Sequence, residues 1–155
     1  MIFVDDQPWA LQGLAAILPW RELGYEICAL CSCGEEALEE IEKQRPDVVF
    51  TDIRMPDMSG IELIAKLRGK GLQTAIVIIS GYSDFEVALE AVNYHAFQYL
   101  LKPLERGRVE AVAKELARTL RGEEVSQEEL RRRHTAEAGG FSYAGHPVTA
   151  DIQYY

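Results

Sequence analysis

The sequence predicts an α/β fold in which five strands and five helices alternate, a (βα)5 chain that forms a doubly wound five-stranded parallel sheet. Short apolar runs, several of them continuous and β-branched like Ile76-Val77-Ile78-Ile79, are typical of strands covered on both faces. Between these runs, apolar residues recur with the helical period, most clearly in residues 109–120. Parallel strands joined by right-handed crossover helices carry helices on both faces of the sheet.

The first two strand–helix units lie in residues 2–45. A strand at residues 2–4 precedes Pro8, a residue favoured at the first position of a helix, and a strand at residues 26–31 precedes the second helix. The second helix ends before Pro46, because a proline disfavours the helical conformation of the residue before it. The inward faces of the two helices are predicted to consist of Leu11, Leu14, Leu18, Ala37, Leu38 and Ile41.

The other three units follow in the same order, with strands at residues 48–51, 75–80 and 99–101. Lys70-Gly71 marks the end of the third helix, and Ser83-Asp-Phe-Glu86 is a capping box that opens the fourth. The inward faces of these helices are predicted to consist of Leu63, Ile64, Leu67, Phe85, Ala88, Leu89, Val92, Val109, Val112, Ala113, Leu116 and Leu120.

All ten predicted elements lie in residues 1–121, which we interpret as one domain of the chain of 155 residues. Gly122 ends the last helix and is followed by a strongly charged stretch, then by a segment rich in glycine and tyrosine. We interpret residues 122–155 as a linker or truncated tail that leads toward a second domain.

Charge and composition exclude several classes of protein. The chain has 16 basic and 25 acidic residues and a net charge of −9, whereas nucleic-acid binding needs a basic face, so we expect no direct nucleic-acid binding. No apolar run approaches the roughly 20 residues that a membrane span needs, and no secretory leader precedes the first strand. These features predict a cytoplasmic protein without a membrane segment.

The cysteines and tryptophans are predicted to be structural residues rather than parts of a functional site. Cys28 and Cys31 have the spacing of zinc ligands, but no second pair accompanies them. An odd number of cysteines favours free thiols, and with Cys33 they are predicted to lie in or beside a buried strand. Trp9 and Trp20 are interpreted as packing residues.

Polar side chains follow four of the predicted strands. Asp5 and Asp6 come after the first strand, Asp52 after the third, Ser80 at the end of the fourth and Lys102 after the fifth. The carboxyl ends of parallel strands meet at one edge of the sheet, where α/β proteins bind their ligands. We therefore expect three carboxylates, a hydroxyl and an amine to lie together there.

Such a cluster has a specific chemistry. Neighbouring carboxylates repel one another and raise each other's pKa, and Mg²⁺ relieves the repulsion while keeping positions open for water and phosphate oxygens. A carboxylate can act as a nucleophile and form an aspartyl phosphate. Lys102 would then pair with a phosphoryl oxygen, and Ser80 could hydrogen-bond another. The cluster predicts phosphoryl transfer.

Four motifs together resemble the receiver domain of bacterial two-component response regulators, the CheY-like fold, over residues 1–121. They are Val4-Asp-Asp6, Thr51-Asp-Ile-Arg-Met-Pro-Asp-Met-Ser-Gly60, Ser80-Gly-Tyr-Ser83 and Tyr99-Leu-Leu-Lys-Pro103. The resemblance implies the strand order 2-1-3-4-5. Trp20-Arg-Glu-Leu-Gly-Tyr25 is further similar to receivers of regulators with an AraC-type DNA-binding output, which this chain does not contain.

The resemblance implies a role for each acidic residue of the cluster. Asp52 is the expected phosphoacceptor. Asp6 and Asp52 are expected to ligate Mg²⁺ directly, together with the backbone carbonyl of Arg54, and Asp5 to act mainly through water.

The resemblance also implies the parts that respond to phosphorylation. Ser80 is the expected switch hydroxyl, Tyr99 the aromatic residue that rotates with it, and Lys102 the amine that pairs with the phosphoryl group. The Lys102–Pro103 peptide bond is expected to be cis. Gly60 is expected to permit the turn after the phosphorylation loop.

The function implied is a signalling switch. A sensor histidine kinase would phosphorylate Asp52, and the change would repack the fourth helix, fifth strand and fifth helix. A homodimer formed on phosphorylation and control of transcription through the missing output domain are expected. The chain would catalyse only its own phosphorylation and dephosphorylation, so we do not expect an enzyme that turns over a substrate.

Other functions were weighed against this one. A pseudo-receiver that only docks partners is disfavoured by the complete acidic set. Mg²⁺-dependent aspartyl phosphatases place two acids two residues apart after the first strand, whereas Asp5 and Asp6 are adjacent here. A flavodoxin-like cofactor domain would need a phosphate-binding loop after that strand, which the sequence lacks.

Two departures from the family pattern bear on the phosphorylated state. Gln7 stands where receivers more often have an acidic residue, which makes the site less negative. Arg54 and Tyr82 each lie two residues after a site residue, and both are bulky. We hypothesise that they shield the acyl phosphate from water and slow its hydrolysis.

Overall fold

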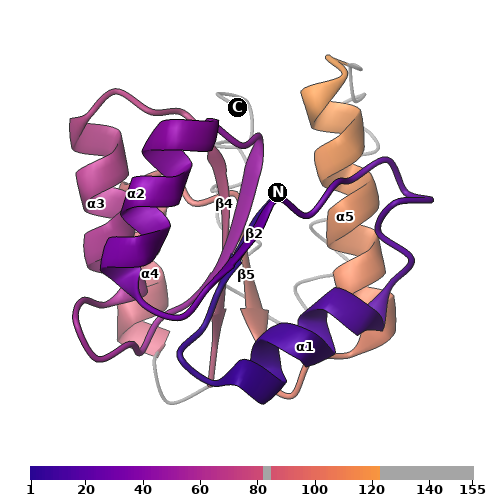
Figure 1. The fold of residues 1–155 in the computed structure, drawn as a ribbon, viewed down its shortest axis with the longest axis horizontal. Helices are drawn as coiled ribbons and strands as arrows, with labels where there is room; N and C mark the ends of the chain where they lie inside the picture. The colour runs from indigo at the N-terminus through magenta and orange to yellow at the C-terminus, as the bar shows by residue number, and fades with distance from the viewer. Residues whose placement is uncertain (82–84, 123–155) are drawn as a thin grey trace.

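The computed structural model describes residues 1–81 and 85–122, in which strands and helices alternate as predicted (Figure 1). The elements are β1 Ile2–Val4, α1 Pro8–Ile17, β2 Ala29–Cys31, α2 Gly34–Gln44, β3 Val48–Asp52, α3 Gly60–Gly69, β4 Ala75–Ser80, α4 Phe85–Asn93, β5 Gln98–Leu101 and α5 Arg106–Leu120. Among the described residues, no helix is both long and apolar enough to cross a bilayer.

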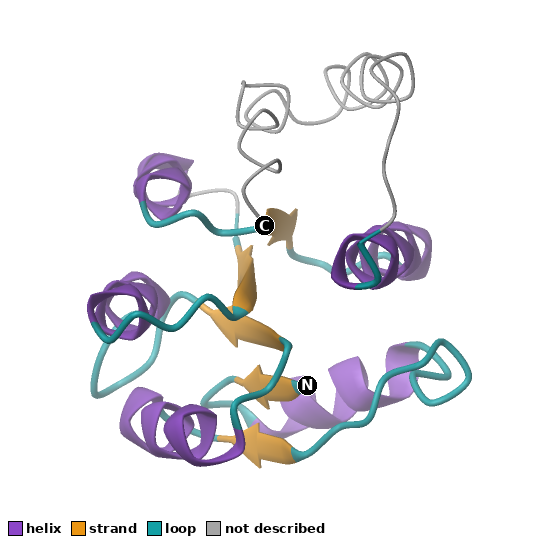
Figure 2. Ribbon diagram, turned by 90° about the horizontal axis from the view of Figure 1, so that it is seen from above, coloured by secondary structure: helices purple, strands orange, loops and turns teal. Residues whose placement is uncertain are grey.

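The strands form one parallel sheet in the order β2-β1-β3-β4-β5. Helices α2, α3 and α4 cover one face, and α1 and α5 cover the other (Figures 1 and 2). The central strands β3 and β4 are buried along their whole length, as their continuous apolar sequences predict. The predicted CheY-like fold and its strand order are confirmed.

Helix ends follow local chemistry. Pro8 is the first residue of α1, and Arg45 ends α2 in the left-handed conformation at φ 49°. At the start of α3, Ser59 and Glu62 form a capping box that the sequence analysis did not single out. Gly122 follows α5 with φ 76°, as its predicted role in ending the helix requires. The capping box predicted at Ser83 lies outside the described residues, as does nearly all of the predicted tail.

The prediction of a buried strand over residues 26–31 is wrong in two respects. The strand is limited to Ala29–Cys31, and it lies at an edge of the sheet, where only β1 pairs with it. Leu30 is 44% exposed as a result. Cys31 is buried but Cys28 is exposed, and all three cysteines are free thiols, as predicted.

Several apolar side chains differ from their predicted inward positions. Leu89 and Leu120 are each 46% exposed. Trp20 is buried, but Trp9 is 70% exposed, so its interpretation as a packing residue is wrong. Periodicity identifies the face of a helix but not how far its neighbours extend over that face. Trp9 is the second residue of α1 and lines a groove with Lys102 and Leu104.

Candidate functional site

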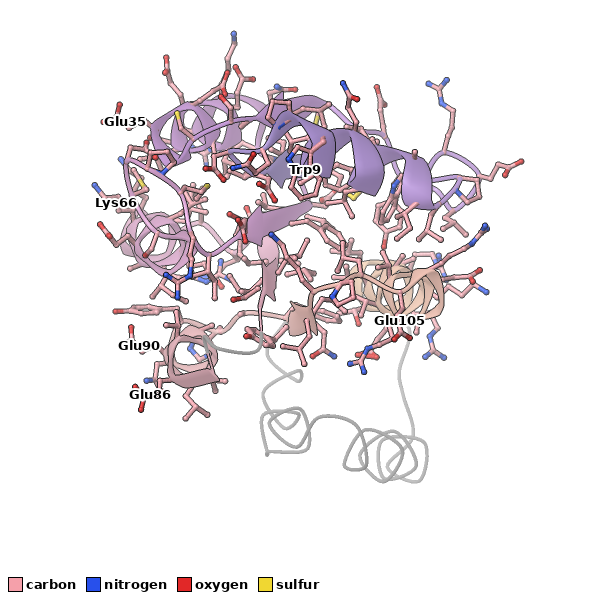
Figure 3. All side chains as sticks on the ribbon, turned by 90° about the horizontal axis from the view of Figure 1, so that it is seen from below. Trp9, Glu35, Lys66, Glu86, Glu90 and Glu105 are labelled. Carbon is pink, nitrogen blue, oxygen red and sulfur yellow. The ribbon has the colours of Figure 1, made fainter. Side chains whose placement is uncertain are left out.

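Four strands deliver the predicted polar side chains to one edge of the sheet. Asp5 follows β1, Asp52 and Ser80 are the last residues of β3 and β4, and Lys102 follows β5. Register explains their proximity, because Asp52 lies opposite Ile79, the neighbour of Ser80. The first turns of the helices surround this edge in Figure 3.

The three carboxylates form a tight cluster. One oxygen from each of Asp5, Asp6 and Asp52 lies within 4.8 Å of the others. Asp5 and Asp52 are each 7% exposed, and Asp6 is half-buried. The Lys102 Nζ atom lies 3.3 Å from the Asp52 Oδ1 atom and 3.7 Å from the Asp5 Oδ2 atom, and its side chain remains 37% exposed. The Lys102 ammonium is thus shared between the Asp5 and Asp52 carboxylates.

The pKa values of the two buried acids reflect this crowding. Loss of hydration raises the pKa of Asp52, the charge of Asp5 raises it further, and Lys102 opposes both effects. Burial also raises the pKa of Asp5, against a hydrogen bond from the Gln7 amide, 2.9 Å from Oδ1, and the charge of Lys102. The protein therefore holds two acids where ionisation is costly, which a divalent cation would relieve.

Gly60 is required by close packing rather than by turn geometry. It is the first residue of α3, and its backbone is not among those with positive φ. A Cβ atom at this position would lie 2.5 Å from the backbone oxygen of Asp52. The prediction that Gly60 permits a turn is corrected accordingly: the missing side chain lets α3 begin directly against the carboxyl end of β3.

Ser80 and Tyr99 meet at a shared backbone group. The Ser80 hydroxyl donates to the carbonyl of Gly81 over 3.2 Å, and the Tyr99 hydroxyl donates to the same carbonyl over 3.3 Å. Both side chains are buried, at 1% exposure. The Lys102 amide donates to the Ser80 carbonyl over 2.8 Å, so these residues are adjacent. The Lys102–Pro103 bond is cis, as predicted.

The model of the response regulator receiver domain family matches residues 1–114. The chain belongs to the response regulator receiver domain family. Among solved structures, the receiver domain is similar to that of AraT, a response regulator from Geobacillus stearothermophilus, at 33% identity and a TM-score of 0.74, over 78% of this chain and 94% of the other. It is also similar to a two-component transcriptional regulator AraC from Clostridium phytofermentans, at 30% identity and a TM-score of 0.70, over 76% and 92%.

Curated relatives extend well beyond the receiver domain. The transcriptional regulatory protein YesN of Bacillus subtilis, itself described as uncharacterized, is 34% identical over 125 residues, which are 81% of this chain and 34% of YesN. The transcriptional regulatory protein HptR of Staphylococcus aureus is 33% identical over 120 residues, 77% of this chain and 47% of HptR. The chain thus spans about a third to a half of these relatives.

Arg54 and Tyr82 are the two bulky residues that we hypothesise shield the phosphoryl group from water. Arg54 lies in the loop after Asp52 with an exposed side chain, and Tyr82 lies outside the described residues. A mostly apolar groove of about 520 Å³ adjoins Asp5 and Lys102 and is lined on α1 by Trp9 and Gly13. Trp9 is therefore a feature of the site's surroundings, which its sequence position alone did not indicate.

Proposed function

We propose that this receiver domain is a phosphoacceptor switch in which Asp52 receives a phosphoryl group from a sensor histidine kinase. The observation that carries the proposal is the Asp52 carboxylate, which is buried at the end of β3 and lies 3.3 Å from the Lys102 ammonium. A carboxylate that lies beside one cation and two further carboxylates can bind a metal ion and accept a phosphoryl group.

The donor set fits Mg²⁺. We propose that Asp6, Asp52 and the backbone carbonyl of Arg54 bind the ion directly and that Asp5 acts mainly through water. Three hard oxygen donors leave positions for water and phosphate, as this ion prefers. When bound, Mg²⁺ supplies positive charge against the phosphoryl oxygens and the crowded carboxylates.

The transfer follows from the positions of these side chains. An Asp52 oxygen attacks phosphorus in line with the donor's P–N bond, which breaks, and the electron pair leaves with the histidine nitrogen. Lys102, already within reach of Asp52, pairs with a phosphoryl oxygen and stabilises the charge on it. Hydrolysis returns Asp52 to a carboxylate. We propose that Arg54 and Tyr82 slow this step by shielding the phosphoryl group.

The response starts at the Gly81 carbonyl that Ser80 and Tyr99 share. A phosphoryl oxygen near Asp52 offers the Ser80 hydroxyl a stronger acceptor, because hydrogen bonds to charged groups are stronger. Loss of the Ser80–Gly81 contact changes the surroundings of the Tyr99 hydroxyl, which donates to the same carbonyl. The two states differ in these contacts, which is what allows phosphorylation to shift their populations.

The output is proposed to lie outside the chain. Relatives that carry this domain are transcriptional regulators of two to three times its length. We propose that phosphorylation changes the α4–β5–α5 surface, promotes a homodimer and so controls a DNA-binding domain. The net charge of −9 is consistent with leaving DNA contact to that other domain.

The test is intact mass spectrometry after incubation with Mg²⁺ and acetyl phosphate. The parent protein should gain one phosphoryl group, Asp52→Asn should gain none, and Asp47→Asn, which removes an exposed acid just before the same strand, should behave like the parent. No gain together with no Mg²⁺ binding would favour a pseudo-receiver. Continuous turnover of a small phosphate ester would favour a phosphatase.

A further inference from the structure

The loop from Ile53 to Ser59 joins the phosphoacceptor strand to α3, and both of its ends are fixed. The Ile53 amide donates to the Ile79 carbonyl over 3.2 Å, and the Gly60 amide donates to the Ile53 carbonyl over 2.8 Å. At the other end, the Ser59 side chain caps α3. A further contact holds the middle of the loop.

That contact comes from α2, through Asp57. The Gly34 amide donates to the Asp57 Oδ1 atom over 2.9 Å, and the Glu35 amide donates to the Asp57 Oδ2 atom over 2.7 Å. These hydrogen bonds lower the pKa of Asp57. Both carboxylate oxygens are therefore engaged by a helix that lies 22 to 23 residues earlier in the chain.

Helix α2 lacks a cap of its own. Its N-cap residue is Cys33, which has the extended backbone of an N-cap, with φ −154° and ψ 166°, but makes no capping side-chain hydrogen bond. Free amides at a helix N-terminus need an acceptor, and a carboxylate there also interacts favourably with the helix dipole. Asp57 supplies from the loop what residue 33 would normally supply.

An apolar contact reinforces the polar one. Met58 is buried, at 7% exposure, and its side chain lies over Gly34. A Cβ atom on Gly34 would lie 2.1 Å from Met58 Cγ, which is too close for any side chain to be accommodated without movement. Two neighbouring loop residues thus bind the first residue of α2, one through a carboxylate and one through packing.

We infer that Asp57 is a positioning residue for the Mg²⁺ site: by binding the N-terminus of α2 it holds the 53–59 loop, and with it the Arg54 carbonyl, in the conformation that receives the ion. The inference rests on the proposed function, because it assigns Arg54 a metal-facing carbonyl. Residues that orient a metal's direct ligands typically change metal affinity about 10–100-fold when removed.

A plain helix cap would also be lost in Asp57→Ala, so a second variant separates the two roles. In Asp57→Ala/Cys33→Ser, a near-isosteric serine at the N-cap position can cap α2 from within the helix. This double variant should regain the stability of the parent protein. It should not regain the loop position, because nothing new links the loop to α2.

The first measurement is calorimetric titration with Mg²⁺ alone, without a phosphoryl donor. The dissociation constant should rise about tenfold or more in Asp57→Ala and stay raised in the double variant. Asp57→Asn keeps one acceptor oxygen, so its Mg²⁺ dissociation constant should lie between those of Asp57→Ala and the parent. A second groove, distinct from the one beside Lys102, is lined by the 53–59 loop and by Glu90 of α4. Glu90→Gln removes an exposed acid of this groove and controls for the loss of charge, so it should bind Mg²⁺ like the parent.

The second measurement is amide hydrogen exchange in EDTA, which does not depend on metal binding. Residues 53–59 should exchange faster in the double variant than in the parent, whereas α2 should exchange at the parental rate. Parental exchange of the loop, or parental Mg²⁺ affinity in the double variant, would overturn the inference. Failure of the parent itself to bind Mg²⁺ would instead overturn the proposed metal site.

Discussion

The core between the sheet and helices α1 and α5 contains a cluster of packed aromatic rings, whereas the core beneath α2, α3 and α4 is mainly aliphatic and is joined by polar contacts at helix ends. On the first face, Trp20 packs against Phe3, Phe50 and Tyr25 with ring centroids 5.4 to 5.7 Å apart. The Tyr25 hydroxyl donates to the Ala113 carbonyl and so joins the segment after α1 to α5.

On the second face, most of the described side chains of α4 are exposed or half-buried. Of the α4 side chains that the structure describes, only Ala91 is buried, and Glu86 points away from the body of the protein (Figure 3). Arg68 joins α3 to the segment after α4, because its guanidinium donates to the carbonyls of Tyr94 and His95.

The difference identifies which parts of the receiver domain can serve as a scaffold and which can respond. Regions with few buried apolar contacts open at a lower free-energy cost than regions within the core. Helix α5 buries Val109, Val112, Ala113 and Leu116, so its inner face is anchored in the core. Helix α4 follows Gly81, whose carbonyl accepts from Ser80 and Tyr99. The proposed switch therefore adjoins a helix whose described side chains lie mostly at the surface.

Removing the central ring of the aromatic face should have the largest effect. Trp20→Ala should lower the free energy of unfolding by about 3–5 kcal/mol, because a large cavity replaces a buried indole. On the other face, Leu89→Ala should change it by less than about 0.5 kcal/mol, because Leu89 is 46% exposed. Urea denaturation followed by circular dichroism measures both. Similar losses in the two variants would contradict the contrast between the faces.

Removing the Arg68 guanidinium should loosen the second face at one place. Arg68→Ala leaves the carbonyls of Leu72, Tyr94 and His95 without these donors and should cost about 1–3 kcal/mol. Amide exchange should accelerate in residues 91–97 and stay unchanged in α5. Lys66→Ala, an exposed change on the same helix, is the control, and equal acceleration in α5 would refute a local role for Arg68.

A smaller change tests the polar contact of the aromatic face. Tyr25→Phe keeps the ring against Trp20 but loses the hydrogen bond to Ala113, which should cost about 0.5–1.5 kcal/mol. Burial raises the pKa of Tyr25 to about 12, so the phenol stays protonated and the cost should be constant from pH 3 to about pH 9. A cost that varied over this range would show that another group is involved.

The smallest expected effect is the pH dependence of the corresponding contact on the second face. The folded pKa of Asp57 lies below the usual 3.8, so its carboxylate stabilises the fold above that pH, and the contribution is lost as the pH falls from there through the folded pKa. Asp57→Asn should cost about 0.3–1 kcal/mol at pH 7, and the difference should shrink as the pH falls below 3.8 and through the folded pKa. Urea denaturation at several pH values checks this, and a difference that grew in acid would contradict it.

Much of the molecule was predictable because parallel strands obey simple rules. Continuous apolar runs predict β3 and β4. Because the carboxyl ends of parallel strands share one edge of the sheet, the sequence also predicts that Asp5, Asp52 and Lys102 lie together, as they do. The elements at the margins were predicted less well. The sequence predicts that Leu30 lies in a buried strand. Leu30 is 44% exposed, because its strand lies at the edge of the sheet.

The amino-acid sequence by itself determined the alternation of strands and helices and the set of acids at the site. The hydrophobic period, the residues that begin and end helices, and the residue that follows each strand can all be identified from short stretches of sequence. Only the tertiary structure decided that Asp57 would cap a helix 22 to 23 residues away, that Gly60 would be needed for close packing, and that Trp9 would face a groove. Those outcomes depend on which surfaces meet when the chain folds, and the period of a single segment carries no information about its neighbour.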